Sequence, residues 1–193
     1  MNKTAKTTYK INDLIASRWS PRSFTGESIS DEDLFSLFEA ARWAPSAMNE
    51  QPWRFLYAKR GEAAFDKMVA ALKPGNQPWA PNASALIVTL VKKTFERNGA
   101  PNAAASHDLG LAVGNLTIQA TELGYALHQM GGFEHHLIID YFNIPEDYEP
   151  VTIIAVGKAG SPEQLEGALR DRELATRNRR PLEEIVFHET FNG

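Results

Sequence analysis

The sequence contains no cysteine. Disulfide bonds, thiolate metal sites, iron–sulfur clusters and cysteine nucleophiles are therefore excluded, so any chemistry uses other groups. Long apolar runs are missing as well. No stretch approaches the roughly 20 apolar residues of a membrane-spanning helix, and the polar start MNKTAKTTYKINDLIASR lacks the apolar core of a signal peptide. We therefore expect a cytoplasmic protein without a membrane partner.

Several common catalytic motifs are also absent. There is no G-x-G-x-x-G, no G-x-x-x-x-G-K-[ST], no G-x-S-x-G and no H-E-x-x-H, so several familiar enzyme classes have no local support. An excess of positive charge is missing too: 20 basic against 24 acidic residues give a formal net charge of -4, which argues against a nucleic-acid partner. Glu134, His135 and His136 are consecutive, but consecutive helix residues point in different directions, so we expect no metal site.

The chain has the length and apolar content of one globular domain. Its 193 residues are 43% hydrophobic and contain no repeat or long linker, which predicts a single domain over residues 1–193. Apolar periodicity predicts helices at 11–17, from about 30 to Pro45, at 62–72, from 106 to about 123 and at 133–141, and strands at 53–58, 84–91, 125–129 and 151–156. Interleaved strands and helices predict a layered α/β or α+β domain.

The longest predicted helix carries its own boundary residues. It begins near Ser106 or Asp108, and Gly124 suits the left-handed position just beyond its end. Gly110 and Gly114 lie one helical turn apart. We interpret them as a place where another helix approaches closely, with contact to a ligand as the alternative.

The segment after the second predicted helix is unusual. Ser30 can cap that helix, Asp33 lies where a capping box has its acidic residue, and Pro45 ends the helix. The following stretch, APSAMNEQPWRF, has two prolines, few charges and many apolar residues, so it fits neither a regular element nor an ordinary solvated loop. We expect it to contact another part of the protein or a ligand.

Two arginine-rich segments lie near opposite ends of the chain. RWSPRSF supplies Arg18 and Arg22, and TRNRRPLEE supplies Arg177 and Arg179, which share one face of an extended segment. A guanidinium is a planar fork of donors that suits phosphate, so the two pairs can converge on one dianion. The alternative is that each cluster is solvated or pairs with nearby acids such as Glu173.

A pair of glycines follows the short strand predicted at 125–129. Gly131 and Gly132 permit a positive φ and leave room for a flat ligand to lie against bare backbone. A plain tight turn is the alternative interpretation.

Taken together, these segments resemble the nitroreductase family of FMN-dependent NAD(P)H oxidoreductases, in particular its shorter single-domain members. The resemblance covers nearly the whole chain, and its motifs occur in the expected order. They are R-x-S-x-R-x-F at 18–24, A-P-S-A-x-N-x-Q-P-W at 44–53, G-N at 75–76, SHDLGLAVGNL, M-G-G-F at 130–133, P-E-D-Y-E-P-V at 145–151 and R-x-R-R-P-L-E-E at 177–184.

The resemblance implies an α+β fold whose central sheet is mixed but mostly antiparallel and is flanked by helices. It also implies a homodimer with an exchanged C-terminal arm and with FMN at the subunit interface. The implied cofactor-binding residues are Arg18, Trp19, Ser20, Arg22, Pro45, Ser46, Ala47, Asn49, Asn76, Gln129, Met130, Gly131, Gly132, Arg177 and Arg179.

The same resemblance implies roles for these residues. Arg18, Arg177 and Arg179 look like phosphate ligands, and Ser20 looks like a hydrogen-bonding neighbour. Trp19 stands where many relatives have a second basic residue, and Arg22 looks like a cation near flavin N1 and O2. Asn76 looks like the amide that binds the pyrimidine edge, and the Gly131 N–H looks like the group facing N5. The segment from Pro45 to Asn49 looks like a lid over the flavin of the partner. Trp79 stands where some relatives have a lysine close to the flavin.

The implied activity is a ping-pong transfer of hydride from NAD(P)H, through flavin N5, to nitroaromatic, quinone or similar small aromatic acceptors. No side chain need act as a nucleophile, because the cofactor carries the chemistry. Two alternatives remain open. One is a specialised enzyme of the same fold, which dehalogenates, dehydrogenates or fragments flavin, and the other is a flavin-binding carrier or sensor without turnover.

Overall fold

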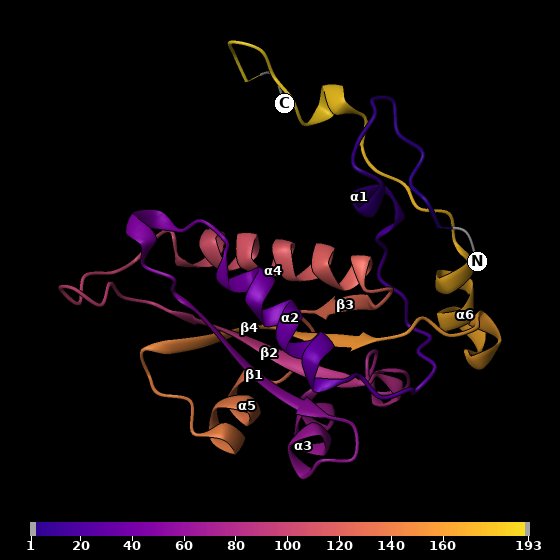
Figure 1. Cartoon of the computed structure of the whole chain (residues 1–193), viewed down its shortest axis with the longest axis horizontal. Helices are drawn as coiled ribbons and strands as arrows, with labels where there is room; N and C mark the ends of the chain where they lie inside the picture. The colour runs from indigo at the N-terminus through magenta and orange to yellow at the C-terminus, as the bar shows by residue number, and fades with distance from the viewer. Residues whose placement is uncertain (1–2, 192–193) are drawn as a thin grey trace.

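A computed structural model describes residues 3–191 of the chain, and Figure 1 shows one open sheet with helices on both faces. The strands are β1 (Trp53–Lys59), β2 (Ala85–Lys92), β3 (Ala126–Met130) and β4 (Tyr148–Gly157). The helices are α1 (Asp13–Ser17), α2 (Asp31–Arg42), α3 (Ala63–Ala71), α4 (Ala105–Glu122), α5 (His135–Phe142) and α6 (Gly167–Leu174). None of the helices in this part of the chain is long and apolar enough to cross a membrane.

The four strands lie in the order β1-β2-β4-β3, and all three pairings are antiparallel. The predicted α+β class with a mostly antiparallel sheet is therefore confirmed, while the parallel component of a mixed sheet does not occur among the pairings within residues 3–191. Strands β2 and β4 are central. This position explains why the stretch SALIVTLV is apolar without alternation, because both of its faces are buried.

Two hydrophobic cores sandwich the sheet. Helices α2 and α4 cover one face, and α3 and α5 cover the other (Figure 1). Alternate residues of β2 enter opposite cores: Ile87 packs with α2 and α4, whereas Leu86 and Val88 pack with α3 and α5. Trp53, at the start of β1, is 6% exposed and belongs to the core under α2 and α4. The sheet is therefore the rigid floor from which the surrounding loops project.

The helix boundaries agree with the sequence analysis at several points. The Ser30 hydroxyl accepts a hydrogen bond from the Asp33 N–H at 3.0 Å and so caps α2. The Asp33 carboxylate instead accepts a hydrogen bond from the Tyr125 hydroxyl at 2.8 Å, so a tertiary contact takes the place of the reciprocal half of a capping box. Gly124 follows α4 with a φ of 72°, as predicted.

Other boundaries differ from the expectation. Strand β4 begins at Tyr148 rather than at 151, because Glu149 and Pro150 pair with the end of β2 beyond a register shift. Helix α4 begins at Ala105, and neither Ser106 nor Asp108 caps it. Helix α6 was not predicted, because it is short and mostly exposed, and its sequence has little apolar periodicity.

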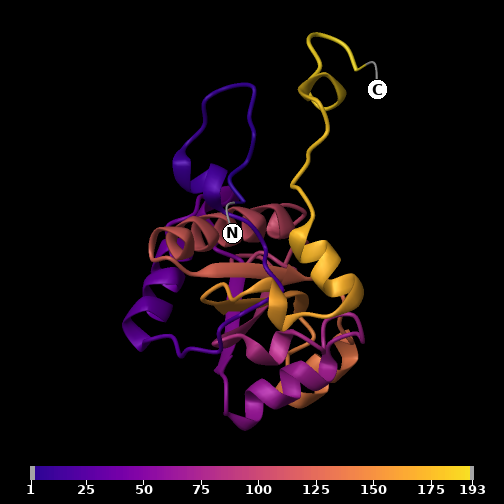
Figure 2. The ribbon, with the colours of Figure 1, turned by 90° about the vertical axis from the view of Figure 1, so that its right-hand side faces the viewer.

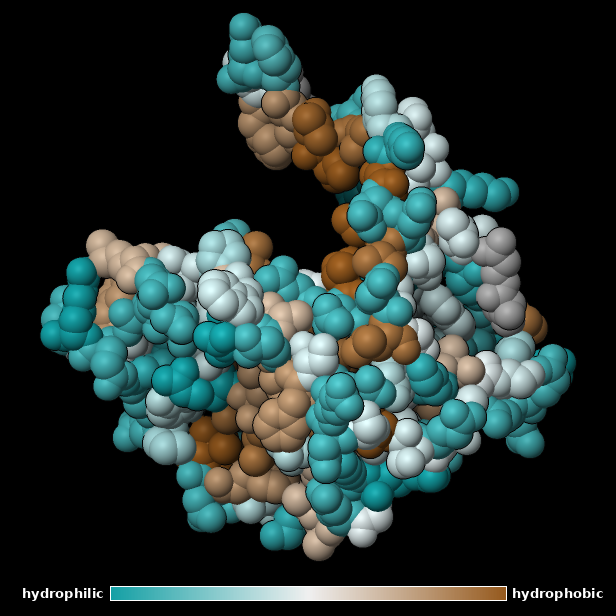
Figure 3. Space-filling model, in the orientation of Figure 1, coloured by the Kyte–Doolittle hydropathy of each residue, from teal (hydrophilic) through white to brown (hydrophobic). Residues whose placement is uncertain are grey.

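The N-terminal segment with α1 and the segment after α6 both project from the body of the molecule, as the two perpendicular views show (Figures 1 and 2). The projecting parts carry exposed apolar side chains, and Figure 3 shows their hydrophobic surface above the main body. The exposed residues include Tyr9, Ile15, Leu182, Ile185, Val186 and Phe191.

Candidate functional site

Three arginines from the two ends of the chain meet in one place. Arg18 follows α1, and Arg177 and Arg179 follow α6, yet all three line a single cavity of about 580 Å³. Burial is the main cause that lowers the pKa of Arg18, and the positive charges of Arg177 and Arg179 lower it further. Three of the four side chains predicted to converge therefore share one cavity in the folded chain, whereas the fourth, Arg22, does not line it.

Within the described residues, no acidic side chain forms a salt bridge with this cluster. The salt bridges found within residues 3–191 include none that involve Arg18, Arg177 or Arg179, whereas the neighbouring Arg180 lies 3.8 Å from Glu184. Because like charges at short range repel, a cluster of this kind is favourable only when an anion or solvent neutralises it. The interpretation that these arginines pair with nearby acids is therefore wrong for these three residues.

Backbone carbonyl groups hold the cluster in part. The Arg177 Nη1 donates to the carbonyl of Lys3 at 2.6 Å and to that of Ala16 at 2.8 Å, which ties the N-terminal segment to the region after α6. The Arg18 Nη1 donates to the Ser20 hydroxyl at 3.3 Å. Trp19 does not line the cavity, and its ring lies 5.5 Å from the Lys3 ammonium.

Arg22 lies apart from this cluster, beside β3. Its side chain is half-buried, and burial lowers its pKa, while the neighbouring carboxylate of Glu173 acts in the opposite direction. The preceding carbonyl, that of Pro21, is 2.9 Å from the Nδ1 of His128, in the middle of β3. The position of Arg22 is thus coupled to the strand that leads directly into the paired glycines.

The backbone after β3 is extended rather than turned. Neither Gly131 nor Gly132 has a positive φ, and residue 133 forms a bridge with residue 72. The tight-turn alternative is therefore wrong. A Cβ built at Gly131 would meet no atom within 4 Å, so open space lies in front of this residue. Asn76 lies alongside, because its Nδ2 donates to the Gly132 carbonyl at 3.2 Å.

Two residues near this site point away from it. The side chain of Met130 is 3% exposed and packs in the core under α3 and α5, so only its backbone can face a ligand. Trp79, which the resemblance associates with a position close to the flavin, is fully buried, and its ring centroid lies 4.6 Å from that of His128. The Gln129 side chain, in contrast, is exposed.

The proline-bracketed segment after α2 has an unusual backbone. Met48, Asn49 and Gln51 all have φ values between 52° and 56°, in the left-handed region that costs non-glycine residues about 1–3 kcal/mol each. Contacts from elsewhere hold this shape. The buried carboxylate of Asp108, in the first turns of α4, accepts a hydrogen bond from the Ala47 N–H at 3.0 Å. We call residues 45–51 the flap.

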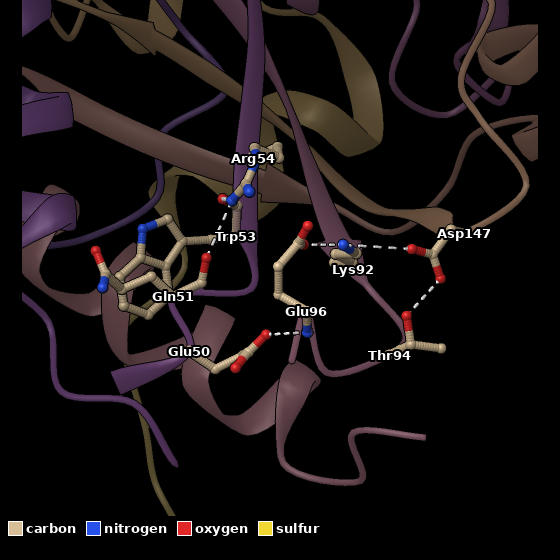
Figure 4. A network of polar contacts seen from close by, with 8 residues as sticks. All are labelled: Glu50, Gln51, Trp53, Arg54, Lys92, Thr94, Glu96 and Asp147. Atoms are coloured by element: carbon tan, nitrogen blue, oxygen red, sulfur yellow. Dashed lines mark hydrogen bonds and ion pairs between the residues drawn. The ribbon is translucent and has the colours of Figure 1, made fainter. Parts of the chain in front are cut away.

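A polar network anchors the far end of the flap (Figure 4). The Glu50 carboxylate accepts a hydrogen bond from the N–H of Glu96, in the hairpin that follows β2. The Glu96 side chain pairs with Lys92, which also lies 3.7 Å from Asp147. Exposed ion pairs contribute little stability, so the network fixes the flap's position more than it stabilises the fold.

The flap and the arginine cluster lie at opposite ends of α4. The flap contacts the first turns of α4 through Asp108, whereas α1 and the segment after α6 lie near its other end (Figure 1). Eighteen residues of helix span about 27 Å. The exposed face of α4 between them contains Gly110 and Gly114, and no helix of the described chain packs there, although one was expected.

Three polar residues of this region were not assigned a site role from the sequence: Asp108, His128 and Glu173. Each acts on a backbone group more than 60 residues away in the chain, so no local pattern indicates its partner. Glu134 pairs with Lys73, and His135 stacks on Phe133. Within the described residues, no group of three or more histidine, aspartate or glutamate side chains is arranged to hold a metal ion.

Fold and site together define the class: an α+β protein with an antiparallel sheet between helix pairs and an arginine-lined cavity built from both ends of the chain. The chain belongs to the nitroreductase family. The model of that family matches residues 15–73 and 57–158, which confirms the resemblance seen in the sequence motifs.

Known proteins and structures agree with this assignment. The chain is 35% identical to a crystal structure described as an oxidoreductase containing FMN, with a TM-score of 0.94 and coverage of 100% of this chain and 98% of that one. A nitroreductase family protein of Clostridium difficile 630 is 25% identical, with a TM-score of 0.72 over 92% of this chain and 97% of its own. A protein of Archaeoglobus fulgidus, provisionally named an NADH dehydrogenase/NAD(P)H nitroreductase, is 30% identical over 75% of this chain and 82% of its own.

Proposed function

We propose that this chain is an FMN-dependent oxidoreductase that moves hydride from NAD(P)H to nitroaromatic, quinone or similar small aromatic acceptors. The observation that carries the proposal is the uncompensated cluster of Arg18, Arg177 and Arg179 around one cavity. A phosphate dianion supplies the missing negative charge, and guanidinium groups bind it with charge-assisted hydrogen bonds.

The residues present fit such a cofactor. The three arginines, with Ser20 beside Arg18, would hold the phosphate. Arg22 and Asn76 would face the pyrimidine part of the ring system, and the bare backbone at Gly131 leaves room for a flat ring. When bound, FMN would supply ping-pong chemistry, in which hydride passes from NAD(P)H to flavin N5 and then on to the acceptor.

The chain's own groups have supporting tasks in this mechanism. Arg22 provides a fixed positive charge where reduction places negative charge, and this interaction favours the reduced form. Its partial burial strengthens the interaction, because less water screens it. An open backbone surface discriminates weakly among aromatic substrates, so we expect broad acceptor tolerance.

We further infer that the functional unit is a homodimer. Pro45, Ser46, Ala47 and Asn49 belong to the flap, which lies a helix length away from the arginine cluster of its own chain. In a symmetric dimer packed along α4, the flap of one chain would cover the cavity of the other. The open face around Gly110 and Gly114 suits such a close approach between helices.

The segment after α6 is the candidate exchanged arm. Its apolar side chains are exposed in the single chain: Ile185 is 56% exposed and Phe191 is 78% exposed. We predict that deletion of residues 181–193 shifts the protein from dimer to monomer in analytical ultracentrifugation, because these side chains lose the partner surface that buries them. A truncated chain that stays dimeric at the same concentration contradicts the exchange.

The proposed function is tested by measuring the flavin absorption of the protein and its bleaching on reduction. The purified protein is expected to show the absorption spectrum of oxidised flavin and to release FMN on denaturation. NADH or NADPH added without oxygen should bleach that spectrum, and a quinone or nitroaromatic should restore it. A colourless protein that does not bind added FMN contradicts the proposal, and bound flavin that neither nicotinamide reduces would leave a carrier rather than an enzyme. The expected cytoplasmic location stays a prediction.

A further inference from the structure

One peptide group near the proposed cofactor site is held at both ends by side chains. This group joins Pro21 to Arg22, in a segment that is neither helix nor strand. Its carbonyl lies 2.9 Å from the Nδ1 of His128, and its N–H donates to the Oε2 of Glu173 at 2.9 Å. Because the C=O and N–H of a trans peptide point in opposite directions, the two contacts together fix the peptide plane.

Glu173 is an unusual residue to find at this position. It is only 1% exposed, and no ion pair to it was found within the described residues. Its other oxygen, Oε1, accepts a hydrogen bond from the Ser23 N–H at 3.2 Å. A buried carboxylate is costly unless hydrogen bonds satisfy it, and here two successive backbone N–H groups do so.

His128 holds the other end of the peptide as a hydrogen-bond donor. A carbonyl oxygen only accepts, so the proton must sit on Nδ1. Burial is the main cause that lowers the pKa of His128, and the positive charge of Arg22 lowers it further, while hydrogen bonds to the backbone of Pro21 and Ser20 act in the opposite direction. The imidazole packs on the fully buried indole of Trp79, whose Nε1 donates to the Gly75 carbonyl at 3.2 Å.

We propose that His128 and Glu173 are positioning residues that aim the guanidinium of Arg22 at the cofactor. The proposal rests on the function proposed above. His128 lies on β3 just before the backbone of residues 129–132. Glu173 comes from α6, which follows Arg22 by about 150 residues in the sequence. The clamp therefore sets the distance between the cation and the backbone expected to support the ring. A half-buried arginine on an unclamped loop would lose this fixed direction.

The test uses substitutions that separate the hydrogen bond from packing. His128→Phe keeps an aromatic ring against Trp79 but removes the donor, whereas His128→Asn keeps an amide donor close to the position of Nδ1. Glu173→Gln keeps the volume but replaces one acceptor by a donor. Asp171→Asn, on the exposed side of α6, is the matched control for the loss of one negative charge.

Each variant is measured in the wild-type background and with Arg22→Ala. The readouts are the FMN dissociation constant and, for the His128 variants, the flavin midpoint potential, because Glu173→Gln also removes a charge. We expect His128→Phe and Glu173→Gln to weaken FMN binding at least about threefold in the wild-type background. We expect His128→Phe to lower the potential, His128→Asn to restore most of both values, and Asp171→Asn to change neither.

With Arg22 already removed, the same substitutions are expected to have less than about a twofold effect on binding, since the residues act through Arg22. Equal losses in both backgrounds would overturn the proposal, because they indicate general damage to the fold. If Glu173→Gln does not fold, the comparison of His128→Phe with His128→Asn still tests whether the hydrogen bond to the Pro21 carbonyl positions Arg22.

One readout does not depend on FMN. Long-range ¹H–¹⁵N spectra of the apoprotein are expected to show His128 in the Nδ1–H tautomer, and an Nε2–H tautomer would overturn the clamp itself. If the wild-type protein fails to bind FMN while the tautomer is as expected, the proposed function fails and the clamp stands as a contact of the fold. If FMN binds normally to His128→Phe, only the positioning role fails.

Discussion

The arginine cluster makes the sharpest prediction. Replacing Arg177 and Arg179 together by alanine removes two of the four guanidinium groups that line the cavity, and leaves those of Arg18 and of Arg180, which lies 3.8 Å from Glu184. A hydrogen bond to a charged group contributes about 1.5–3 kcal/mol, so the loss for two such residues is about 3–6 kcal/mol. Mutual repulsion within the cluster, which adds to burial in lowering the pKa of Arg18, offsets part of this loss. We therefore take the lower value, and about 3 kcal/mol corresponds to roughly 100-fold weaker FMN binding.

The assay compares two ligands. FMN and riboflavin are titrated into the apoprotein, and binding is followed by the quenching of flavin fluorescence. Riboflavin lacks the phosphate, so the double variant should bind riboflavin as tightly as the wild type does. The wild type should bind FMN more tightly than riboflavin, and the double variant should largely lose this preference. Arg97→Ala with Arg170→Ala, both exposed and outside the cavity lining, removes the same charge as a control.

Two results would refute this reasoning. The first is an unchanged FMN affinity in the double variant. The second is an equal loss for FMN and riboflavin, which would mean that the variant damages the site in general. Such damage is a specific concern at Arg177, because its bonds to the carbonyls of Lys3 and Ala16 tie down the N-terminal segment. A melting curve of the apoprotein separates this effect from phosphate recognition.

Other predictions concern Arg22 and the core. Arg22→Ala is expected to retain FMN but to lower its midpoint potential, because the reduced form loses a nearby cation; a spectroelectrochemical titration without a shift contradicts this. Gly157→Ala places a Cβ 2.9 Å from the Phe24 ring and 3.0 Å from the Ser84 hydroxyl, and we expect it to cost about 1–3 kcal/mol in urea unfolding. Gly75→Ala meets open space and is expected to leave stability nearly unchanged; equal effects at both glycines would contradict the packing argument. Leu37 lies on the buried face of α2, and we expect Leu37→Ala to lower the free energy of unfolding by about 2–5 kcal/mol in the same assay.

Much of the fold could be predicted because the sequence features that specify it lie within a few residues of one another. The positions of β1, β2, α2 and α4 follow from apolar periodicity, and Ser30 and Gly124 mark helix ends through contacts within a few residues. The short helix α6 was not predicted because its buried residue is the charged Glu173 and its sequence has little apolar periodicity.

The residues of the candidate site could be predicted from the sequence only in part. The arginine motifs indicated which side chains could bind phosphate. Glu173 was considered only as an ion-pair partner in the alternative interpretation, and it instead binds two backbone N–H groups. The tight turn that was the alternative interpretation at Gly131 and Gly132 does not form, and residue 133 instead bridges to residue 72. In both cases the deciding contact comes from a segment far away in the sequence.

By itself, the sequence determined most of the strands and the longer helices, the absence of cysteine chemistry and the supply of cationic side chains at both ends of the chain, because these depend on composition and on neighbours within one or two turns. Only the tertiary structure decided that Arg18, Arg177 and Arg179 share one cavity, that Trp79 is buried, and that the flap lies at the opposite end of α4 from the cluster. These three features depend on how the sheet brings distant segments of the chain together. Local sequence patterns do not specify which distant segments come into contact.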